Sequence, residues 1–165
     1  MTEQSHSPLT SLLQLAKKSL RAEDESAFGF LVVNETHFLT PYRQALLWLS
    51  PEGEQGQIQS LSGLANPDQR TPYIEYLTGL LNQWDSMGLT HEMILVSDAM
   101  KKGSDGSEWE RWLPQYALWL PLFGMDMGYL GGMLLAREKV WSEQEIKLLA
   151  ELSPFYGHGW EALLH

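Results

Sequence analysis

Cysteine is absent from this 165-residue sequence. The chain therefore forms no disulfide, carries no cysteine-ligated zinc or iron–sulfur site, and has no thiol for catalysis or for a thioether-linked chromophore. This absence agrees with a reducing compartment. The polar N-terminus, Met1 to Pro8, also lacks the basic cluster and the apolar run of a secretory signal. We therefore expect a cytoplasmic protein.

Basic residues are scarce, because 11 Lys and Arg stand against 21 Asp and Glu, which gives a formal net charge of −10. Nucleic acids and anionic membrane surfaces both require a basic footprint, so neither is expected as a partner. No stretch reaches the roughly 20 continuous apolar residues that span a bilayer. We expect no direct membrane insertion.

Hydrophobic residues make up 44% of the sequence and charged residues 19%, as in ordinary globular chains. A chain of this length buries a core without help from metals or disulfides. We predict a polar tail over residues 1–8 and a single domain over residues 9–165.

The N-terminal part predicts two helices. Ser7 and Pro8 form a cap-and-proline start, and the apolar spacing after them predicts a helix over residues 8–22. An acidic cluster then precedes residues 27–39, whose apolar pattern fits either a strand or a helix. The acidic start and the length favour a helix that ends before Pro41.

The middle of the chain predicts a hairpin and a helix-bearing excursion. Residues 43–49 and 57–62 form the hairpin, with the more polar second strand at a sheet edge. Residues 93–96 form a short buried strand or helix, and residues 101–108 a mobile loop. A helix starts at Thr71–Pro72, and its inward face comprises Ile74, Leu77, Leu80, Leu81 and Trp84.

The C-terminal third carries the clearest pattern. Two apolar strands are predicted at 115–122 and 129–137. Ser142 and Glu145 form a capping box that starts the last helix, and Pro154 is expected to kink that helix. The order of all elements predicts an α+β fold: an antiparallel β-sheet with the N- and C-terminal helices on one face and the helix-bearing excursion over the other.

Three stretches carry a resemblance to a known family: Trp119-Leu120-Pro121-Leu122, Tyr129 to Arg137, and Trp141-Ser142-Glu143. In this order they resemble the GAF domain, a small-molecule sensory fold, and the likeness covers nearly the whole chain. PAS-like and profilin-like sensor folds share the general layout and stay open as alternatives. A weaker likeness, at Val33–Thr36, Pro41–Ala45 and Tyr156–Trp160, points to GAF-type regions of bacterial membrane-fusion or efflux-adaptor proteins.

The resemblance also restricts the subclass. Bilin-binding and methionine-sulfoxide-reducing GAF domains need cysteine, which this chain lacks. The Asn-Lys…Phe…Asp-Glu motif of the cyclic-nucleotide class is absent. The resemblance therefore implies a sensory domain without naming its ligand.

Candidates for catalysis are weak. His91, Glu92 and Asp98 lack the spacing of metal ligands. Gly131 and Gly132 lie within a predicted strand, where they favour a bulge or the close approach of a helix over a phosphate loop. His158 lies between two glycines near the chain end, which favours a structural role over metal or haem ligation. We expect no enzymatic activity, metal site or cofactor.

Seven tryptophans in 165 residues is a high number, and several fall near the excursion. The resemblance implies a pocket that the excursion closes over the sheet, with Arg70 or Arg111 as an anchor for an anion. An equally favoured alternative is that Trp and Met side chains fill this face. The expected apolar walls of an open pocket are Trp48, Tyr73, Trp109, Tyr116 and Trp119.

We predict a non-catalytic sensory or regulatory domain that binds a small molecule and signals through its terminal helices. A homodimer through these helices and a protein partner that carries the output are expected. The alternative is a protein–protein interaction or scaffold module with a filled pocket, linked to an efflux or membrane-fusion system. An unrecognised enzyme is a third hypothesis, which no constellation of residues supports.

Overall fold

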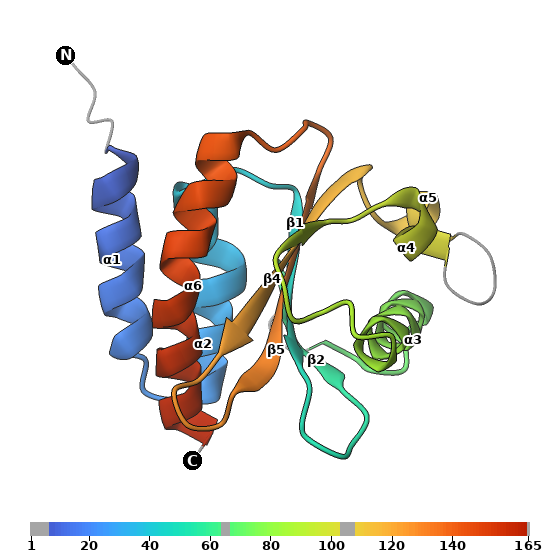
Figure 1. The fold of residues 1–165 in the computed structure, drawn as a ribbon, viewed down its shortest axis with the longest axis horizontal. Coiled ribbons are helices and arrows are strands. Elements are labelled where there is room, and N and C mark those ends of the chain that lie inside the picture. The colour runs from blue at the N-terminus through green and yellow to red at the C-terminus, as the bar shows by residue number, and fades with distance from the viewer. Residues whose placement is uncertain (1–6, 64–66, 103–107, 165) are drawn as a thin grey trace.

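The fold is a five-stranded antiparallel sheet between two layers of helices (Figure 1). The computed structural model describes residues 7–63, 67–102 and 108–164. The central strand β5 pairs with β1 on one side and with β4 on the other. In the sheet order β2-β1-β5-β4-β3, the strands are β1 (Gln44–Leu49), β2 (Gln57–Leu61), β3 (Ile94–Leu95), β4 (Tyr116–Phe123) and β5 (Tyr129–Arg137).

The helices divide between the two faces of the sheet, as Figure 1 shows. One face is covered by α1 (Pro8–Leu20), α2 (Glu25–Phe30) and α6 (Glu143–Leu164), together with the short π-helix η1 (Leu31–Glu35) and the 3-10 turn η2 (Thr36–Phe38). The excursion between β2 and β4 covers the other face with α3 (Pro72–Ser86), α4 (Asp98–Lys102) and α5 (Trp109–Trp112). This arrangement confirms the predicted α+β architecture.

The two N-terminal helices form where their caps predict them. The Ser7 Oγ accepts a hydrogen bond from the Thr10 amide at 3.2 Å, and α1 ends at Leu20, slightly before the predicted end. The Asp24 carboxylate caps α2 by accepting from the Ala27 amide at 2.8 Å. The ambiguous residues 27–39 are helical, but they pass from α-helix to π-helix to 3-10 turn rather than forming one regular helix.

The central elements also match their predictions. The hairpin of β1 and β2 is present, and β2 lies at a sheet edge. Thr71 caps α3, whose predicted inward face is buried in every member. Residues 93–96 were predicted to form either a strand or a helix. Ile94 and Leu95 form a strand, because they pair with β4.

The mobile loop predicted over residues 101–108 is wrong at its start. Lys101 and Lys102 form the last turn of α4, and Glu108 directly precedes α5. The reason is one local and one tertiary contact: the Ser97 Oγ accepts from the Met100 amide, and the Met100 carbonyl accepts from Trp84 Nε1 at 2.9 Å. Residues 103–107 lie outside the described residues.

The strand glycines permit close approach between strands. A Cβ built on Gly131 would lie 1.8 Å from the Trp48 carbonyl oxygen, and its φ of +143° is one that L side chains rarely adopt. A Cβ on Gly132 would meet the Trp119 ring at 2.5 Å. The expected bulge is present beside them, where the register shifts between Leu122 and Phe123. The neighbour that approaches Gly131 is strand β1 rather than the helix we expected.

The last helix starts with the predicted capping box and continues through Pro154. The Glu145 amide donates to the Ser142 Oγ at 3.1 Å, and the Ser142 amide donates to a Glu145 carboxylate oxygen at 3.0 Å. Proline has no N–H for the Ala150 carbonyl, but the Ser153 hydroxyl donates to that carbonyl at 3.1 Å. Among the helices described, none combines the length and the apolar character needed to cross a membrane.

Candidate functional site

Four tryptophans are buried on the face for which we left open either a pocket or a filling of Trp and Met side chains. Trp48, Trp84, Trp109 and Trp119 are at most 1% exposed, between the sheet and helices α3 to α5. The rings of Trp84 and Trp109 stack with centroids 6.5 Å apart, and Trp84 meets Trp119 edge-on at 6.3 Å. These four side chains therefore pack against one another and leave none of their own ring surface open to a ligand.

All four indole N–H groups of this tryptophan cluster are paired. Trp48 Nε1 donates to the Asp85 carboxylate at 2.9 Å, and Trp84 Nε1 donates to the Met100 carbonyl. Trp109 and Trp119 donate to the carbonyls of Pro114 and Thr90 at 2.7 and 2.8 Å. The cluster therefore offers no free indole donor to a bound molecule, and its polar atoms serve packing.

The two arginines considered as anion anchors lie on the surface. The side chain of Arg70 is 90% exposed, with its nearest carboxylate, on Asp68, at 3.6 Å. The side chain of Arg111 is 71% exposed, and its guanidinium lies over the Trp112 ring at 5.4 Å. Neither arginine is brought to the buried tryptophans.

The two tyrosines considered as pocket walls are half-buried. The Tyr73 hydroxyl donates to the Gln44 side chain at 2.7 Å, and burial raises the pKa of Tyr73 to about 12. Tyr116 is the first residue of β4 and pairs with Arg137 of β5. The residues that we predicted to line a pocket are thus not gathered at one site: some lie in the tryptophan cluster, some on the surface, and Tyr116 at the start of strand β4.

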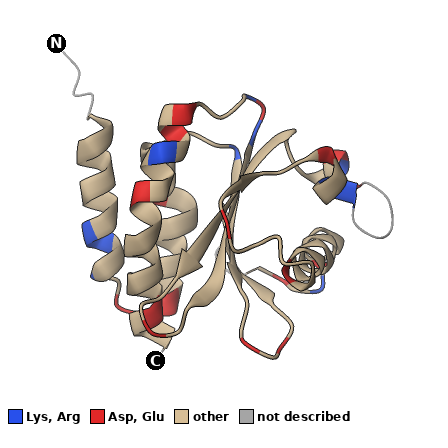
Figure 2. Cartoon of the chain, in the orientation of Figure 1, with Lys and Arg blue, Asp and Glu red and all other residues tan. Residues whose placement is uncertain are grey.

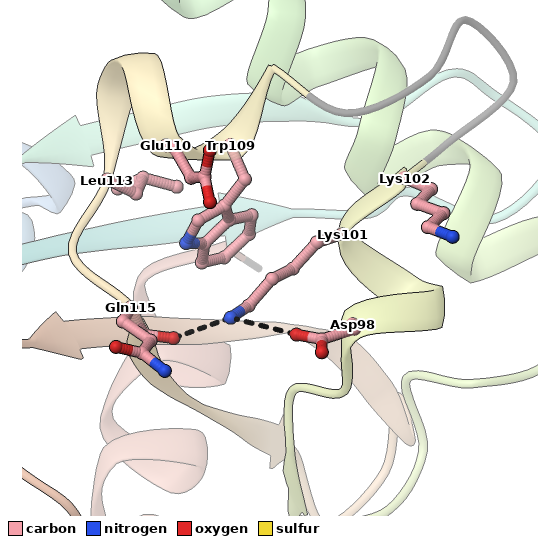
Figure 3. Close-up of a pocket in the computed structure, with 7 residues that line it drawn as sticks. All are labelled: Asp98, Lys101, Lys102, Trp109, Glu110, Leu113 and Gln115. Carbon is pink, nitrogen blue, oxygen red and sulfur yellow. Dashed lines mark hydrogen bonds and ion pairs between the residues drawn. The ribbon is translucent and has the colours of Figure 1, made fainter.

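One cavity lies beside α4 and α5 (Figure 3) and has a volume of ≈ 680 Å³. Trp109 lines it, and no other residue of our predicted set is among its lining residues. Lys101 crosses the cavity, and its Nζ donates to the Gln115 carbonyl at 2.6 Å, with an Asp98 oxygen at 3.6 Å. Because protein groups already hold this ammonium, it is a poor anchor for an anion. The lining residues are Asp98, Lys101, Lys102, Trp109, Glu110, Leu113 and Gln115.

A second cavity, which we call the hairpin groove, lies where the β1–β2 loop meets the end of α3 and the β4–β5 turn. Its volume is ≈ 530 Å³. The His91 ring lies against the Tyr129 ring, with centroids 4.3 Å apart, and Phe123 is 5.8 Å from Tyr129. The lining residues are Ser50, Pro51, Glu52, Gly53, Glu54, Gln55, Asn82, Asp85, Ser86, His91, Met127 and Tyr129.

Asp85 organises the base of the hairpin groove. One carboxylate oxygen accepts from Trp48 Nε1 and from the Ser50 hydroxyl at 2.9 and 2.8 Å. The other accepts from the hydroxyls of Thr90 and Tyr129 at 2.6 and 2.8 Å. Burial, together with the acceptor and charge of Asp85, raises the pKa of Tyr129 above its ordinary value.

Comparisons with known proteins bear on the fold. No family sequence model matches the chain, and no curated protein sequence matches it. Among solved structures, a GAF domain of a phosphoenolpyruvate-protein phosphotransferase from Coxiella burnetii superposes with a TM-score of 0.67 and 16% identity, over 94% of this chain and 93% of that chain. This chain has the GAF fold.

Other solved GAF-fold structures are similar to the same degree. The GAF domain of a sensor histidine kinase from Pseudomonas syringae pv. tomato has a TM-score of 0.57 and 16% identity, over 94% of this chain and 86% of that chain. A free methionine-R-sulfoxide reductase from Neisseria meningitidis, solved with its substrate, has a TM-score of 0.66 and 15% identity, over 99% and 94%. At these identities the likeness establishes the fold alone, which confirms the resemblance seen in the sequence.

The residues weighed for catalysis are not gathered in this GAF-fold chain. His91 is exposed against Tyr129, whereas the Asp98 side chain is 95% exposed beside Lys101. His158 is exposed on α6. Within residues 7–63, 67–102 and 108–164, no group of three or more His, Asp or Glu could hold a metal ion.

A buried carboxylate on α6 is the polar feature that sequence reasoning missed most clearly. Glu161 is 6% exposed, and it accepts from the amides of Met125, Asp126 and Met127 in the β4–β5 turn. A Cβ on Gly124 would meet this carboxylate at 2.3 Å. The glycine and the acid are 37 positions apart in the sequence, so only the tertiary fold brings them together.

Proposed function

We propose that this chain is a non-catalytic regulatory domain that acts through protein association, with a second copy of itself as the partner. The observation that carries this proposal is an outward leucine stripe on α1. Leu9, Leu13 and Leu20 are 63%, 48% and 55% exposed. Exposed leucines that share one helix face are typical of association surfaces.

The stripe is distinct from the face of α1 that packs inside the domain. Leu12, Leu15 and Ala16 are buried in the core between α1, α6 and the sheet. Leu9 and Leu13 are one helical turn apart, and Leu20 follows two turns later on the same side. Helix α1 therefore has an inner apolar face for its own domain and an outer one for another chain.

Charge favours a second copy with its helices antiparallel to the first. Helix α1 contains the basic residues Lys17 and Lys18 near its end and no acidic residue, whereas α6 begins with Glu143 and Glu145. Lys18 pairs with Glu35 and Glu145 with Arg137 inside the domain, so the charges offered to a second copy are those of the exposed Lys17 and Glu143. Figure 1 shows α1 and α6 side by side and running the same way, and Figure 2 shows basic colour on lower α1 and acidic colour at the top of α6. A twofold axis across the helices brings these opposite charges together twice, which is the geometry of an isologous dimer.

The filled tryptophan cluster supports association over ligand binding within the sheet and excursion. Small-molecule sensing remains a second candidate function, because the hairpin groove lies outside that cluster. Several GAF domains of similar fold are described as parts of a sensor histidine kinase or of phosphotransferases, which supports a regulatory role and a protein partner that carries the output. A cytoplasmic location and a link to an efflux or membrane-fusion system remain predictions.

The test is the subunit number in solution. We expect the purified chain to sediment as a dimer and the double variant Leu9→Gln/Leu13→Gln to sediment as a monomer. The control is Met87→Gln, which removes an apolar side chain that is 59% exposed at the end of α3, away from α1. A monomeric wild type, or an equal loss of dimer in the control, would show the proposal to be wrong.

A further inference from the structure

The loop that forms one wall of the hairpin groove is anchored at both of its ends. The loop is fixed at its start, where the Ser50 hydroxyl donates to Asp85, and near its end, where the Gly56 amide donates to the Asn82 side chain at 2.9 Å. Trp48 further restricts this end, because a Cβ on Gly56 would lie 2.2 Å from its ring. The loop is therefore tied to α3 at both ends, whereas residues 52–55 between these anchors are exposed.

The charge of the groove is of one sign. Glu52, Glu54 and Asp85 line it, and neither Lys nor Arg does. No ion pair found in the described part of the chain involves any of these three carboxylates. The four donors around Asp85 are neutral groups, so its negative charge is not balanced. A cation is therefore the ligand that this lining attracts.

The groove also offers an apolar, aromatic surface beside the acids. His91 is exposed and lies against Tyr129, and the Met127 side chain is 49% exposed at the rim. The Tyr129 hydroxyl donates to Asp85, which fixes the orientation of the ring. Carboxylates next to aromatic faces are the combination that proteins use for ammonium groups, through ionic hydrogen bonds and cation–π attraction.

The lining argues against a metal ion and for an organic cation. No group of His, Asp and Glu in the described ranges has the arrangement of a metal site. A volume of ≈ 530 Å³ is within the range of small-molecule sites and far larger than a hydrated ion needs. Two exposed carboxylates on the loop, with the charge of Asp85 at the base, match a ligand with more than one positive charge.

We propose that the hairpin groove binds a small aliphatic polyamine, with its ammonium groups at Glu52 and Glu54 and its methylene chain along His91, Met127 and Tyr129. Asp85 contributes its charge from the base of the groove, while its oxygens remain occupied by protein donors. This site is separate from the leucine stripe on α1, so it does not depend on the proposed self-association.

The test is calorimetric titration of the full chain with spermidine at low ionic strength, paired with 1,4-butanediol as an uncharged probe. We expect saturable binding of spermidine with one ligand per chain and no heat from the diol. In an NMR titration, the amides that shift should cluster at residues 50–55, 85–91 and 127–129. The variant Glu52→Gln/Glu54→Gln should weaken binding by about tenfold or more.

A matched variant separates a site from general attraction to an acidic protein. Glu75→Gln/Glu151→Gln removes the same number of carboxylates from exposed positions on α3 and α6, outside the groove. We expect it to bind spermidine as the wild type does. Absence of saturable binding, or equal weakening in both double variants, would overturn the proposal. A measurement of subunit number on the same samples reports independently on the self-association.

Discussion

Arg137 Nη2 lies 2.6 Å from Glu145 Oε1, and Nη1 of the same guanidinium lies 2.9 Å from Glu145 Oε2. Their side chains are only 7% and 23% exposed. Arg137 also donates to the carbonyls of Pro41 and Val140, and its guanidinium lies 3.9 Å from the centre of the Trp141 ring. This ion pair joins the end of β5, the start of α6 and the segment that enters β1.

The first prediction concerns the stability that this ion pair provides. Glu145→Gln leaves the buried guanidinium without its counter-charge, so we expect the free energy of unfolding to fall by about 2–4 kcal/mol. Glu138→Gln breaks an ion pair with Arg43 whose side chains are 61% and 65% exposed, and we expect a loss below about 1 kcal/mol. Urea unfolding of both variants measures the contrast, and equal losses would contradict the assigned role.

The second prediction is the pH dependence of the same pair. The Arg137 guanidinium holds the pKa of Glu145 well below its ordinary value of 4.5. The contribution of the ion pair to stability is therefore complete above about pH 4.5 and is lost as the pH falls below it. The reason is that Glu145 becomes protonated in the unfolded chain while it stays ionised in the native state. The difference in unfolding free energy between wild type and Glu145→Gln should be constant near neutrality and shrink in acid. A difference that is independent of pH would contradict this account.

The third prediction concerns buried phenols in alkali. Burial raises the pKa of Tyr73 to about 12, and it raises the pKa of Tyr42 and Tyr156 as well. A raised pKa means that the native state keeps protons that the unfolded chain releases near pH 10, so stability is lost as the pH rises above that value. We expect tyrosinate absorbance to appear together with loss of native circular dichroism. Full ionisation of these phenols in a folded protein would refute the prediction.

Local signals in the sequence were sufficient for most of the fold. Caps at Ser7, Thr71 and Ser142 located three helix starts, because each depends on neighbours within one turn. The apolar runs that became β4 and β5 were clear for the same reason, since both are buried along nearly their whole length. The choice over residues 27–39 was open because Phe28, Phe30 and Val32 alternate as in a strand, whereas Leu31 and Val32 also fit a helical stripe. The segment is helical and includes a π-helix.

Local sequence signals could not predict the candidate site. Asp85 and Glu161 act through partners far away in the chain, such as Trp48 and Met125, and no local pattern marks a carboxylate as buried. The tryptophans were recognised, but whether they line a cavity or fill it depends on how closely their rings pack. That is a property of the assembled layers rather than of spacing.

The fourth prediction tests the link between α6 and the β4–β5 turn. Glu161→Gln places an amide group where a carboxylate accepts from three backbone N–H groups, so we expect a loss of about 1–3 kcal/mol in unfolding free energy. Faster hydrogen exchange should appear first at Met125 and Met127. The control is Glu151→Gln, an exposed position on the same helix, which should change neither measurement. Unchanged exchange in the turn would show that the contact does not hold it.

The fifth prediction tests whether the tryptophan cluster is solid. Trp109 is 1% exposed and stacks on Trp84, so Trp109→Ala should lower the unfolding free energy by about 3–5 kcal/mol and leave an apolar cavity. Benzene should then raise the melting temperature of the variant and leave that of the wild type unchanged, because only the variant has space for it. Trp112→Ala, at a half-buried position on the same short helix, is the control and should gain no benzene effect. Stabilisation of the wild type by benzene would mean that an open pocket already exists beneath the excursion. That result would contradict a solid tryptophan cluster and favour an interior ligand site.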